Sequence, residues 1–393
     1  MKKHFVKAAS LVVSILGAGT LMTGCGQKEA ESITFFNYGA NIDSETLQAF
    51  EKEYGITVKM DEFDDMDAMY LKLANSDVKY DVILVSDALM PKMIEEGLLQ
   101  KINKENIPNI QQMDEEYLNL SIDPGNQYSV PYMFGTIGII YDKNVVTEEV
   151  DSWDILWDEK YKDKIFMFDT YRDTIGMALK RLGYSMNSDN PKELEEAKES
   201  LLEQRKLVDP KYGVDNGTTM IAAGETALNM IWSGEGLNLQ DEYPNLVYTL
   251  PKEGVNIWID SLCIPANAAN VEGAEKFINF VSDKESALRI ADEIGYTTPN
   301  KEARLEQPEH VRNNPNAYMP KELMDLSEIY LPLSPSLCNS SNLGIAIVNN
   351  WMIIEAVIYG VMFKAAIEKL VNEPPVNALK KLNASLALLV KIC

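Results

Sequence analysis

Trp258 and Asp260 stand two residues apart in the apolar segment 255–265, whose alternating pattern is typical of a β-strand. Side chains two apart in a strand lie on the same face, so this strand presents an aromatic ring beside a carboxylate. That pair suits a cation with an apolar body, because the ring face attracts the cation and the carboxylate pairs with it. It becomes a binding site only if that face lines a pocket, which other elements have to form.

Length and composition indicate a folded protein of two domains. The chain has 393 residues, of which 46% are hydrophobic and 9% aromatic. Its formal net charge is −24, from 60 acidic and 36 basic residues. This acidic balance makes nucleic acid a poor partner and favours cations instead.

The first 25 residues have the pattern of a bacterial lipoprotein leader. A lysine-rich start precedes an apolar run at 8–22, which is short for a membrane-spanning helix. Residues 21–25, LMTGC, resemble a lipobox, in which the cysteine, here Cys25, receives a diacylglycerol and becomes the mature N-terminus. With residues 26–31 as a tether, we expect an exported protein anchored to the outer face of the cell membrane, or in the periplasmic space of a cell with an outer membrane. The alternative is an ordinary secretory signal with an incidental cysteine.

Cysteine and histidine usage indicates neither a disulfide framework nor a metal site. The cysteines after the leader, Cys263, Cys338 and Cys393, are odd in number and irregularly spaced. We expect Cys263, in its apolar strand, to be a buried free thiol. The two histidines, His4 and His310, cannot build a histidine metal site, and we expect no cofactor and no metal.

Helical and strand patterns alternate along the chain, as in α/β proteins. The first block predicts a β-α-β-α-β unit, with strands at 33–38, 56–60 and 80–85 and helices at 44–54 and 68–73. In the second block we expect helices at 153–157, 175–182 and 191–204 and strands at 165–168, 227–232 and 246–250. A strand at 137–141 would cross to the second domain and the segment 255–265 would return. Two such crossings leave a cleft between domains, where small ligands commonly bind.

Six short motifs occur in the order found in one family. They are FFNY at 35–38, YDV at 80–82 with Ser86, SVPY at 129–132, MIWSG at 230–234, IWIDS at 257–261 and IGYTTPN at 294–300. The chain, over roughly residues 32–335, resembles the spermidine/putrescine-binding proteins of bacterial polyamine ABC transporters.

This resemblance implies a type II periplasmic-binding-protein fold, whose two lobes close around a linear polyamine. Lobe 1 would comprise residues 32–137 and 261–303, and lobe 2 residues 138–260 and 304–335. Each lobe would be an α/β unit, and the ligand cleft would lie between them.

The resemblance also implies a set of ligand-binding residues. Trp232 and Trp258 would stack on the methylene chain, Asp260 would pair with an ammonium, and Tyr296 would add a wall or a hydroxyl contact. The positions that complete the implied set are Tyr38, Ser86, Asp169 and Asp173. Tyr38 stands where the family commonly has tryptophan, and Asp173 where it has glutamate.

The chain also departs from the family pattern. Thr170 replaces an aspartate, Ala88 a tyrosine and Asn41 an aromatic residue. These losses leave polyamine as the expected ligand class, with the choice between spermidine and putrescine open.

Each implied residue has a structural alternative. The two tryptophans could belong to the core, and Asp260 could cap a turn or a helix. Tyr296 and Tyr38 could serve only in packing, whereas Asp169 and Asp173 could form a surface ion network with Arg172. We assign Trp153 and Trp157, four apart on one helical face, to the core.

The tail, residues 336–393, differs from the body. It holds five lysines and three glutamates, whereas the rest of the mature chain is strongly acidic. It could be the product of a shifted reading frame, an unusual packing helix or a weak membrane-associating segment.

The leading hypothesis is a membrane-anchored solute receptor that delivers a polyamine to an ABC permease with its ATPase, and that is itself a monomer. Alternatives within binding proteins are another organic cation and a sensor subunit. An exported enzyme could use Asp169 and Asp173 as acid and base, or Ser86 or Ser233 as a nucleophile. His4 leaves with the leader and His310 lies in a polar stretch, so a general-base histidine is missing and we do not expect an enzyme.

Overall fold

The structure is a computed structural model that describes residues 31–39, 41–214 and 216–332. The expected leader with Cys25, the tether up to residue 30 and the tail at 336–393 lie outside the described residues. No helix within the described ranges is long and apolar enough to cross a membrane.

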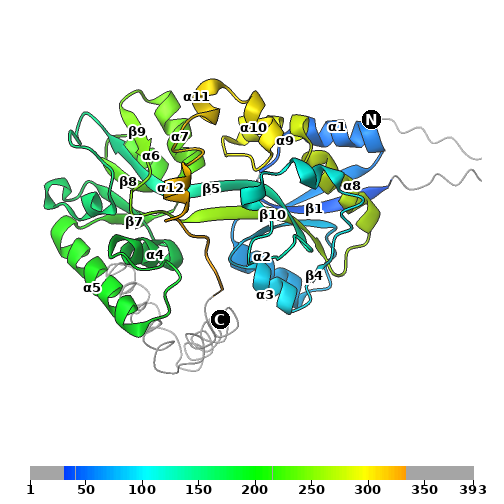
Figure 1. Cartoon of the computed structure of the whole chain (residues 1–393), viewed down its shortest axis with the longest axis horizontal. Coiled ribbons are helices and arrows are strands. Elements are labelled where there is room, and N and C mark those ends of the chain that lie inside the picture. The colour runs from blue at the N-terminus through cyan, green and yellow to red at the C-terminus, as the bar shows by residue number, and fades with distance from the viewer. Residues whose placement is uncertain (1–30, 40, 215, 333–393) are drawn as a thin grey trace, which may run out of the picture.

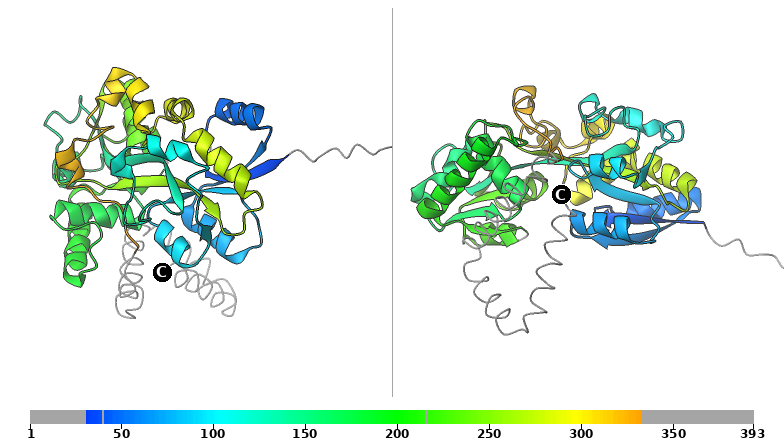
Figure 2. Two further views of the ribbon diagram at one scale, coloured as in Figure 1. Left: turned by 45° about the vertical axis from the view of Figure 1, so that its right-hand side comes forward. Right: turned by 90° about the horizontal axis from the view of Figure 1, so that it is seen from below.

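One twisted sheet of ten strands runs through both halves of the molecule (Figure 1). Its order is β2-β1-β3-β10-β5-β8-β6-β7, with β4 (Leu99–Gln100) beside β10 and β9 (Leu246–Thr249) beside β5. Two lobes therefore share a sheet, and the long central strands connect them (Figure 2). This is the two-lobed α/β fold that the sequence predicted.

Lobe 1 contains the predicted β-α-β-α-β unit. Its parallel strands are β1 (Ser32–Tyr38), β2 (Thr57–Phe63) and β3 (Val82–Ser86). The helices that pack on them are α1 (Ser44–Tyr54), α2 (Met66–Asn75), α3 (Met90–Glu95), α8 (Val271–Val281) and α9 (Lys284–Ile294). The Asp43 side chain accepts the Thr46 N–H and so caps α1, which ends at a left-handed Gly55 with φ of 68°.

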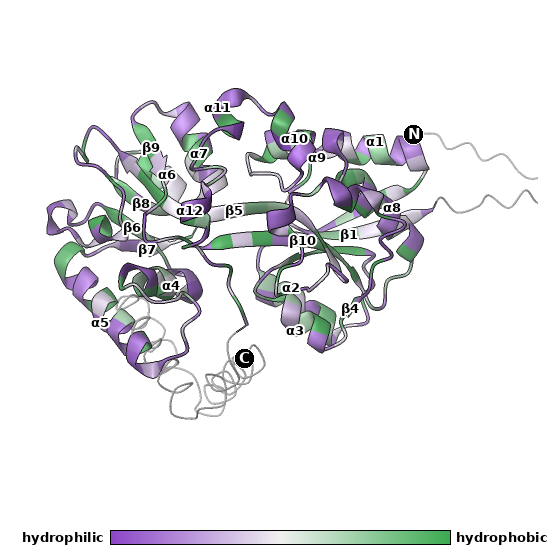
Figure 3. Ribbon diagram, viewed as in Figure 1, coloured by the Kyte–Doolittle hydropathy of each residue, from purple (hydrophilic) through white to green (hydrophobic). Residues whose placement is uncertain are grey.

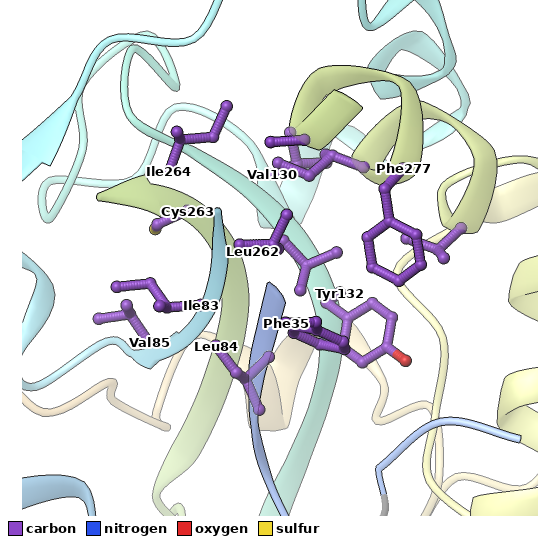
Figure 4. Packing of buried hydrophobic residues seen from close by; sticks show 14 of the residues in the cluster. Phe35, Ile83, Leu84, Val85, Val130, Tyr132, Leu262, Cys263, Ile264 and Phe277 are labelled. Carbon is purple, nitrogen blue, oxygen red and sulfur yellow. The ribbon is translucent and has the colours of Figure 1, made fainter. Parts of the chain in front are cut away.

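The core of lobe 1 lies between the sheet and α8 (Figure 4). The rings of Phe35 and Phe277 meet there with centroids 5.3 Å apart. Cys263 is buried in the same core as a free thiol, as expected. Phe35 and Phe277 are about 240 residues apart in the sequence, so the first and last parts of lobe 1 share one core.

Lobe 2 is built from β6 (Ile165–Phe168), β7 (Lys211–Gly213) and β8 (Leu228–Trp232) with β9. Its helices are α4 (Tyr171–Arg181), α5 (Pro191–Val208), α6 (Asn216–Ala222) and α7 (Ser233–Glu242). Hydrophilic and hydrophobic residues alternate along α5, as Figure 3 shows, because one side of this helix packs on the lobe.

Trp153 and Trp157 are both buried in the lobe 2 core, as expected, but the segment 153–157 is a 3-10 helix. Each indole N–H has a carbonyl acceptor: the Gly254 oxygen lies 3.0 Å from Trp153 Nε1 and the Ser200 oxygen 2.8 Å from Trp157 Nε1. The Ser152 side chain accepts the Asp154 N–H and so caps this short turn.

Two strands cross between the lobes. β5 (Ser129–Asp142) begins well before the predicted start at residue 137, and β10 (Ile257–Pro265) returns beside it. Pro131 lies at the register shift of β10 between Asp260 and Ser261, where a proline is tolerated inside a sheet. The expected lobe boundaries, after residues 137 and 260, both fall inside these strands. Because Trp258 packs on the lobe 1 core and Asp260 pairs with Ser86 of β3, we propose that both residues belong to the lobe 1 side of the crossing.

A separate hydrophobic cluster covers the crossing point. Phe134, Ile257 and Ile259 of the crossing strands pack there with Tyr117 and Tyr318. The chain after α9 reaches this cluster through α10 (Lys301–Glu306), α11 (Glu309–Arg312) and α12 (Lys321–Met324). It then runs along lobe 2, where the Ile257 N–H donates to the Glu328 carbonyl (2.9 Å).

Candidate functional site

The predicted residues lie mainly where parallel strands end. β1 ends at Tyr38 and β3 at Ser86 in lobe 1, while β6 and β8 of lobe 2 end at Phe168 and Trp232. Ligands of open α/β sheets bind beside the carboxyl ends of the strands, because loops and helix N-termini converge there. In each lobe, the edge of the sheet at which these strands end therefore lies toward the crossing strands β5 and β10.

Strand register puts four predicted residues on one face of the shared sheet. Trp258 pairs with Gly135 and Trp232 with Ile137, two positions farther along β5. Asp260 pairs with Ser86 of β3. Directly opposed residues share a face, as do residues two apart in a strand. Both tryptophans, Asp260 and Ser86 therefore belong to the same face.

Trp258 and Tyr296 form an aromatic corner. Their ring centroids are 5.0 Å apart at 80°, an edge-to-face arrangement. Two glycines make room for the rings, because a Cβ at Gly135 would overlap the indole and one at Gly234 would overlap the tyrosine. The indole N–H of Trp258 is buried without an acceptor among the described residues.

Asp260 lies next to this corner and is 9% exposed. No described residue donates a hydrogen bond to its carboxylate or forms an ion pair with it. Burial alone raises its pKa to about 7. The negative charge of Asp260 also raises the pKa of Tyr296, after the larger effects of burial and Glu235, so the two side chains are close.

Asp87 is a candidate that the sequence analysis missed. It follows Ser86 directly and is 2% exposed, and its Oδ2 atom has no partner among the described residues. Burial, and next the charge of Asp260, raise its pKa well above the ordinary value. A polar residue immediately after a parallel strand was the available signal, but nothing near Asp87 in the sequence indicates that the distant Tyr330 backbone N–H donates to its carboxylate.

Asp173 lies across the site in lobe 2, in the first turn of α4. The Thr170 hydroxyl donates to its carboxylate. Burial raises its pKa, whereas contacts with Thr170 and with the Tyr330 hydroxyl act in the opposite direction. The same Tyr330 hydroxyl donates to the Arg172 carbonyl (3.0 Å), so Tyr330 spans from Asp87 to α4.

Arg172, the cation of the alternative in which Asp169 and Asp173 form an ion network, contacts other groups. The guanidinium donates to Asn187 Oδ1 (3.1 Å) and to the Leu331 carbonyl (2.9 Å), and it lies over the Tyr330 ring. It therefore holds the segment that ends the described chain. Asp169 is half-buried, and its backbone N–H donates to the Gly213 carbonyl (3.1 Å).

The remaining predicted rings pack within their own lobes. Trp232 lies against Phe168 with centroids 4.6 Å apart, and Tyr38 meets Phe63 edge to face at 5.5 Å. Burial is the main cause of the raised pKa of Tyr296, and Tyr38 is close enough to contribute to it. The structure thus brings Ser86, Trp258, Asp260 and Tyr296 together, with Tyr38 beside them, and sets Trp232, Asp169 and Asp173 on the lobe 2 side.

The arrangement suits cation binding better than catalysis. His310, the histidine within the described ranges, is exposed on α11. Ser233 Oγ accepts the Thr136 N–H (3.1 Å) and so serves the sheet. No group of metal-binding side chains occurs among the described residues. What gathers at the site is aromatic rings and carboxylates.

A cavity of about 330 Å³ lies elsewhere, between α1, α8 and α9 of lobe 1. Its lining includes Glu53, Tyr54 and Arg289 and none of the predicted residues. We therefore place the candidate site on the convergence of rings and carboxylates at the sheet face and not on this cavity.

The chain is similar to known solute-binding proteins. Residues 45–320 match the family of bacterial extracellular solute-binding proteins. A spermidine/putrescine-binding periplasmic protein of Salmonella typhimurium is 37% identical over 309 residues, which cover 77% of this chain and 88% of that protein. A putrescine-binding periplasmic protein of Pseudomonas aeruginosa is 32% identical over 349 residues, 82% of this chain and 92% of that protein. The crystal structure of a spermidine/putrescine ABC transporter substrate-binding protein from Streptococcus pneumoniae superposes with a TM-score of 0.75 at 34% identity, covering 82% of this chain and 99% of that one.

Proposed function

The chain belongs to the bacterial extracellular solute-binding proteins, and we therefore propose that it is the polyamine-binding component of an ABC transporter. It captures an extracellular polyamine between its lobes and delivers it to the permease. The energy for transport comes from the ATPase of that transporter.

The observation that carries this proposal is the Trp258–Asp260 pair beside Tyr296. A polyamine alternates protonated nitrogens with short hydrocarbon chains, so its site needs carboxylates at intervals and rings between them. A cation–π contact contributes about 0.5–2 kcal/mol, and a buried carboxylate offsets the hydration that the ammonium loses. An aromatic corner next to an unpaired buried carboxylate meets both needs.

Ligand binding would also favour closure of the lobes. Asp260 and Ser86 belong to one side of the site and Asp173 and Trp232 to the other, so a ligand that touches both sides has more contacts in the closed form. A ligand shifts a conformational equilibrium only by its difference in affinity for the two states. The permease then recognises the closed, loaded form.

We further propose that Cys25 anchors the protein to the outer face of the membrane as a monomeric lipoprotein. The apolar leader that precedes LMTGC supports this. Wild-type protein in cell fractions should stay with the membrane and carry a diacylglycerol mass at Cys25. Cys25→Ser should release it, and equal membrane retention of the variant would contradict the anchor.

Calorimetric titration of residues 26–393, the mature chain without its lipidated Cys25, with putrescine, spermidine and spermine tests the function. We expect micromolar or tighter binding to at least one of them, weakened about tenfold or more by Trp258→Ala, which corresponds to about 1.4 kcal/mol. Glutamate serves as an anionic control. A folded sample that binds none of the three polyamines would refute the proposal.

A further inference from the structure

The protein satisfies some of its buried carboxylates fully and leaves others unsatisfied. Asp81 is 5% exposed and accepts three backbone N–H groups, and Asp123 is 3% exposed and accepts four donors. Asp87 and Asp260 are buried to a similar degree, at 2% and 9%. Asp87 accepts the backbone N–H groups of Ala88 and Tyr330, but its Oδ2 atom has no partner, and no described residue donates to the Asp260 carboxylate. A buried carboxylate oxygen without a donor is costly, so a ligand is the natural explanation.

The sheet places the backbones of Asp87 and Asp260 at neighbouring positions, and the charge of Asp260 acts on the Asp87 carboxylate. Ser86 is the strand partner of Asp260, and Asp87 is the next residue along. The Asp87 N–H donates to the Ile259 carbonyl (3.1 Å), which ties the first residue after β3 to the strand that carries Asp260. Both positions are therefore set by ladder hydrogen bonds. The mutual repulsion of the two groups contributes to the raised pKa of Asp87.

Two cations of the facing lobe, Lys180 and Arg172, are engaged by other groups. Lys180 forms an ion pair with Glu328 (2.6 Å), and Arg172 donates to Asn187 and Leu331. No ion pair of the described chain includes Asp87 or Asp260. The pair also lacks the third ligand that a bound metal would need, since no group of three metal-binding side chains occurs in the described part.

We propose that Asp87 and Asp260 together form one ammonium subsite, in which two carboxylates of lobe 1 hold a single primary ammonium end of the polyamine. This inference rests on the proposed function and names where one end of the ligand is bound. A primary ammonium has three N–H donors, so it can bond to both carboxylates at once and neutralise most of their charge. The Trp258 ring, two residues from Asp260, then receives the first methylene groups.

Asp87 has a second possible role, because its carboxylate also contacts the Tyr330 backbone N–H from the other lobe. Asp87→Asn separates the role of Asp87 in ammonium binding from its contact with Tyr330. The asparagine keeps an oxygen for the Tyr330 N–H but removes the charge that an ammonium needs. Asp77→Asn, at an exposed position of the same lobe, changes the net charge equally and serves as the matched control.

The experiment is calorimetric titration of putrescine into the wild-type mature chain, Asp87→Asn and Asp77→Asn, with thermal melting of each. We expect Asp87→Asn to weaken binding about tenfold or more while Asp77→Asn binds like wild type. Asp87→Ser, which lacks the charge but retains a hydroxyl, should lose a similar factor and replaces Asp87→Asn if that variant does not fold.

The outcomes separate the two proposals. If wild type binds putrescine and both Asp87 variants stay within about twofold of it, the subsite is wrong and the function stands. If Asp87→Ser loses binding but Asp87→Asn does not, the contact with Tyr330 is what matters and the subsite is likewise overturned. If wild type binds no polyamine at all, the proposed function fails and the subsite fails with it.

Discussion

The two sides of the candidate site differ in how their polar groups are satisfied. On the lobe 1 side, Asp87 and Asp260 are buried and short of donors, and the Trp258 N–H has no described acceptor. On the lobe 2 side, Asp173 already receives the Thr170 hydroxyl, and Trp232 rests on Phe168. Unsatisfied groups gain most when a ligand arrives. The difference indicates that lobe 1 supplies most of the affinity and lobe 2 mainly closes over the bound ligand.

The largest expected effect comes from Asp260→Asn. Loss of one partner of a buried charge pair costs about 2–5 kcal/mol, so putrescine binding should weaken by a factor of about 30 to several thousand. Calorimetric titration measures this, with Asp77→Asn as the charge-matched control. A loss below about threefold would contradict the larger contribution of the lobe 1 side, because its unpaired carboxylate would then contribute little.

The same variant should stabilise the unliganded protein at pH 8. The Asp260 pKa is about 7 in the fold, against a usual value of 3.8. Between these values the folded state holds a proton that the unfolded state lacks, so stability falls as the pH rises from about 4 to 7. Asparagine removes this cost of roughly 4 kcal/mol. Thermal melting at pH 8 without ligand checks the sign, and a lower melting temperature would contradict it.

The second effect is the pH dependence of polyamine affinity. Below about pH 7 the Asp260 carboxyl is protonated and must release its proton to bind an ammonium, whereas amine groups of the ligand stay charged. The groups that face Asp260 are Asp87 and Tyr296, and Arg172 acts by its charge on Asp87. We expect affinity to rise by up to about tenfold per unit up to pH 7 and then to rise more slowly.

Titrations of wild type between pH 5.5 and 8.5, compared with Asp260→Asn, would measure this dependence. The variant should show a shallower slope, because one of the titrating carboxyls is gone. Equal slopes in both proteins would show that another group releases the proton on binding. Asp260 would then not be a source of the affinity of the lobe 1 side.

The smallest effect should come from Asp173→Asn. The asparagine oxygen can still accept the Thr170 hydroxyl, and the Tyr330 hydroxyl retains the Arg172 carbonyl. We expect about threefold weaker putrescine binding, less than 1 kcal/mol. Titration of Asp173→Asn and Asp260→Asn side by side compares their losses of putrescine affinity. Equal losses would show that the two lobes contribute alike.

Local patterns in the sequence predicted much of the fold. The strand at 165–168 has the predicted bounds, and the pairing of Trp258 with Asp260 on one face follows from a period of two. The early part of β5 was missed for two reasons. It is buried on both faces, so polar and apolar residues do not alternate along it, and it contains Pro131, which is unusual in an inner strand.

The missed site residues depend on long-range contacts. Nothing near Asp87 in the sequence shows that Tyr330 packs against it, because 243 positions separate the two residues. The contact between Asp87 and Tyr330 forms only when the end of the described chain lies beside the crossing strands. Such a contact is a property of the fold and has no local pattern.

The way the chain enters and leaves lobe 2 also bears on how such proteins can diversify. The Ile137 N–H donates to the Asn256 carbonyl (3.2 Å), so the two points are direct neighbours. The residues between them therefore have the topology of a cassette inserted in the chain of lobe 1, with two junctions side by side. Recombination between related genes at these junctions would exchange one wall of the binding site while the carboxylates of the other wall stay in place.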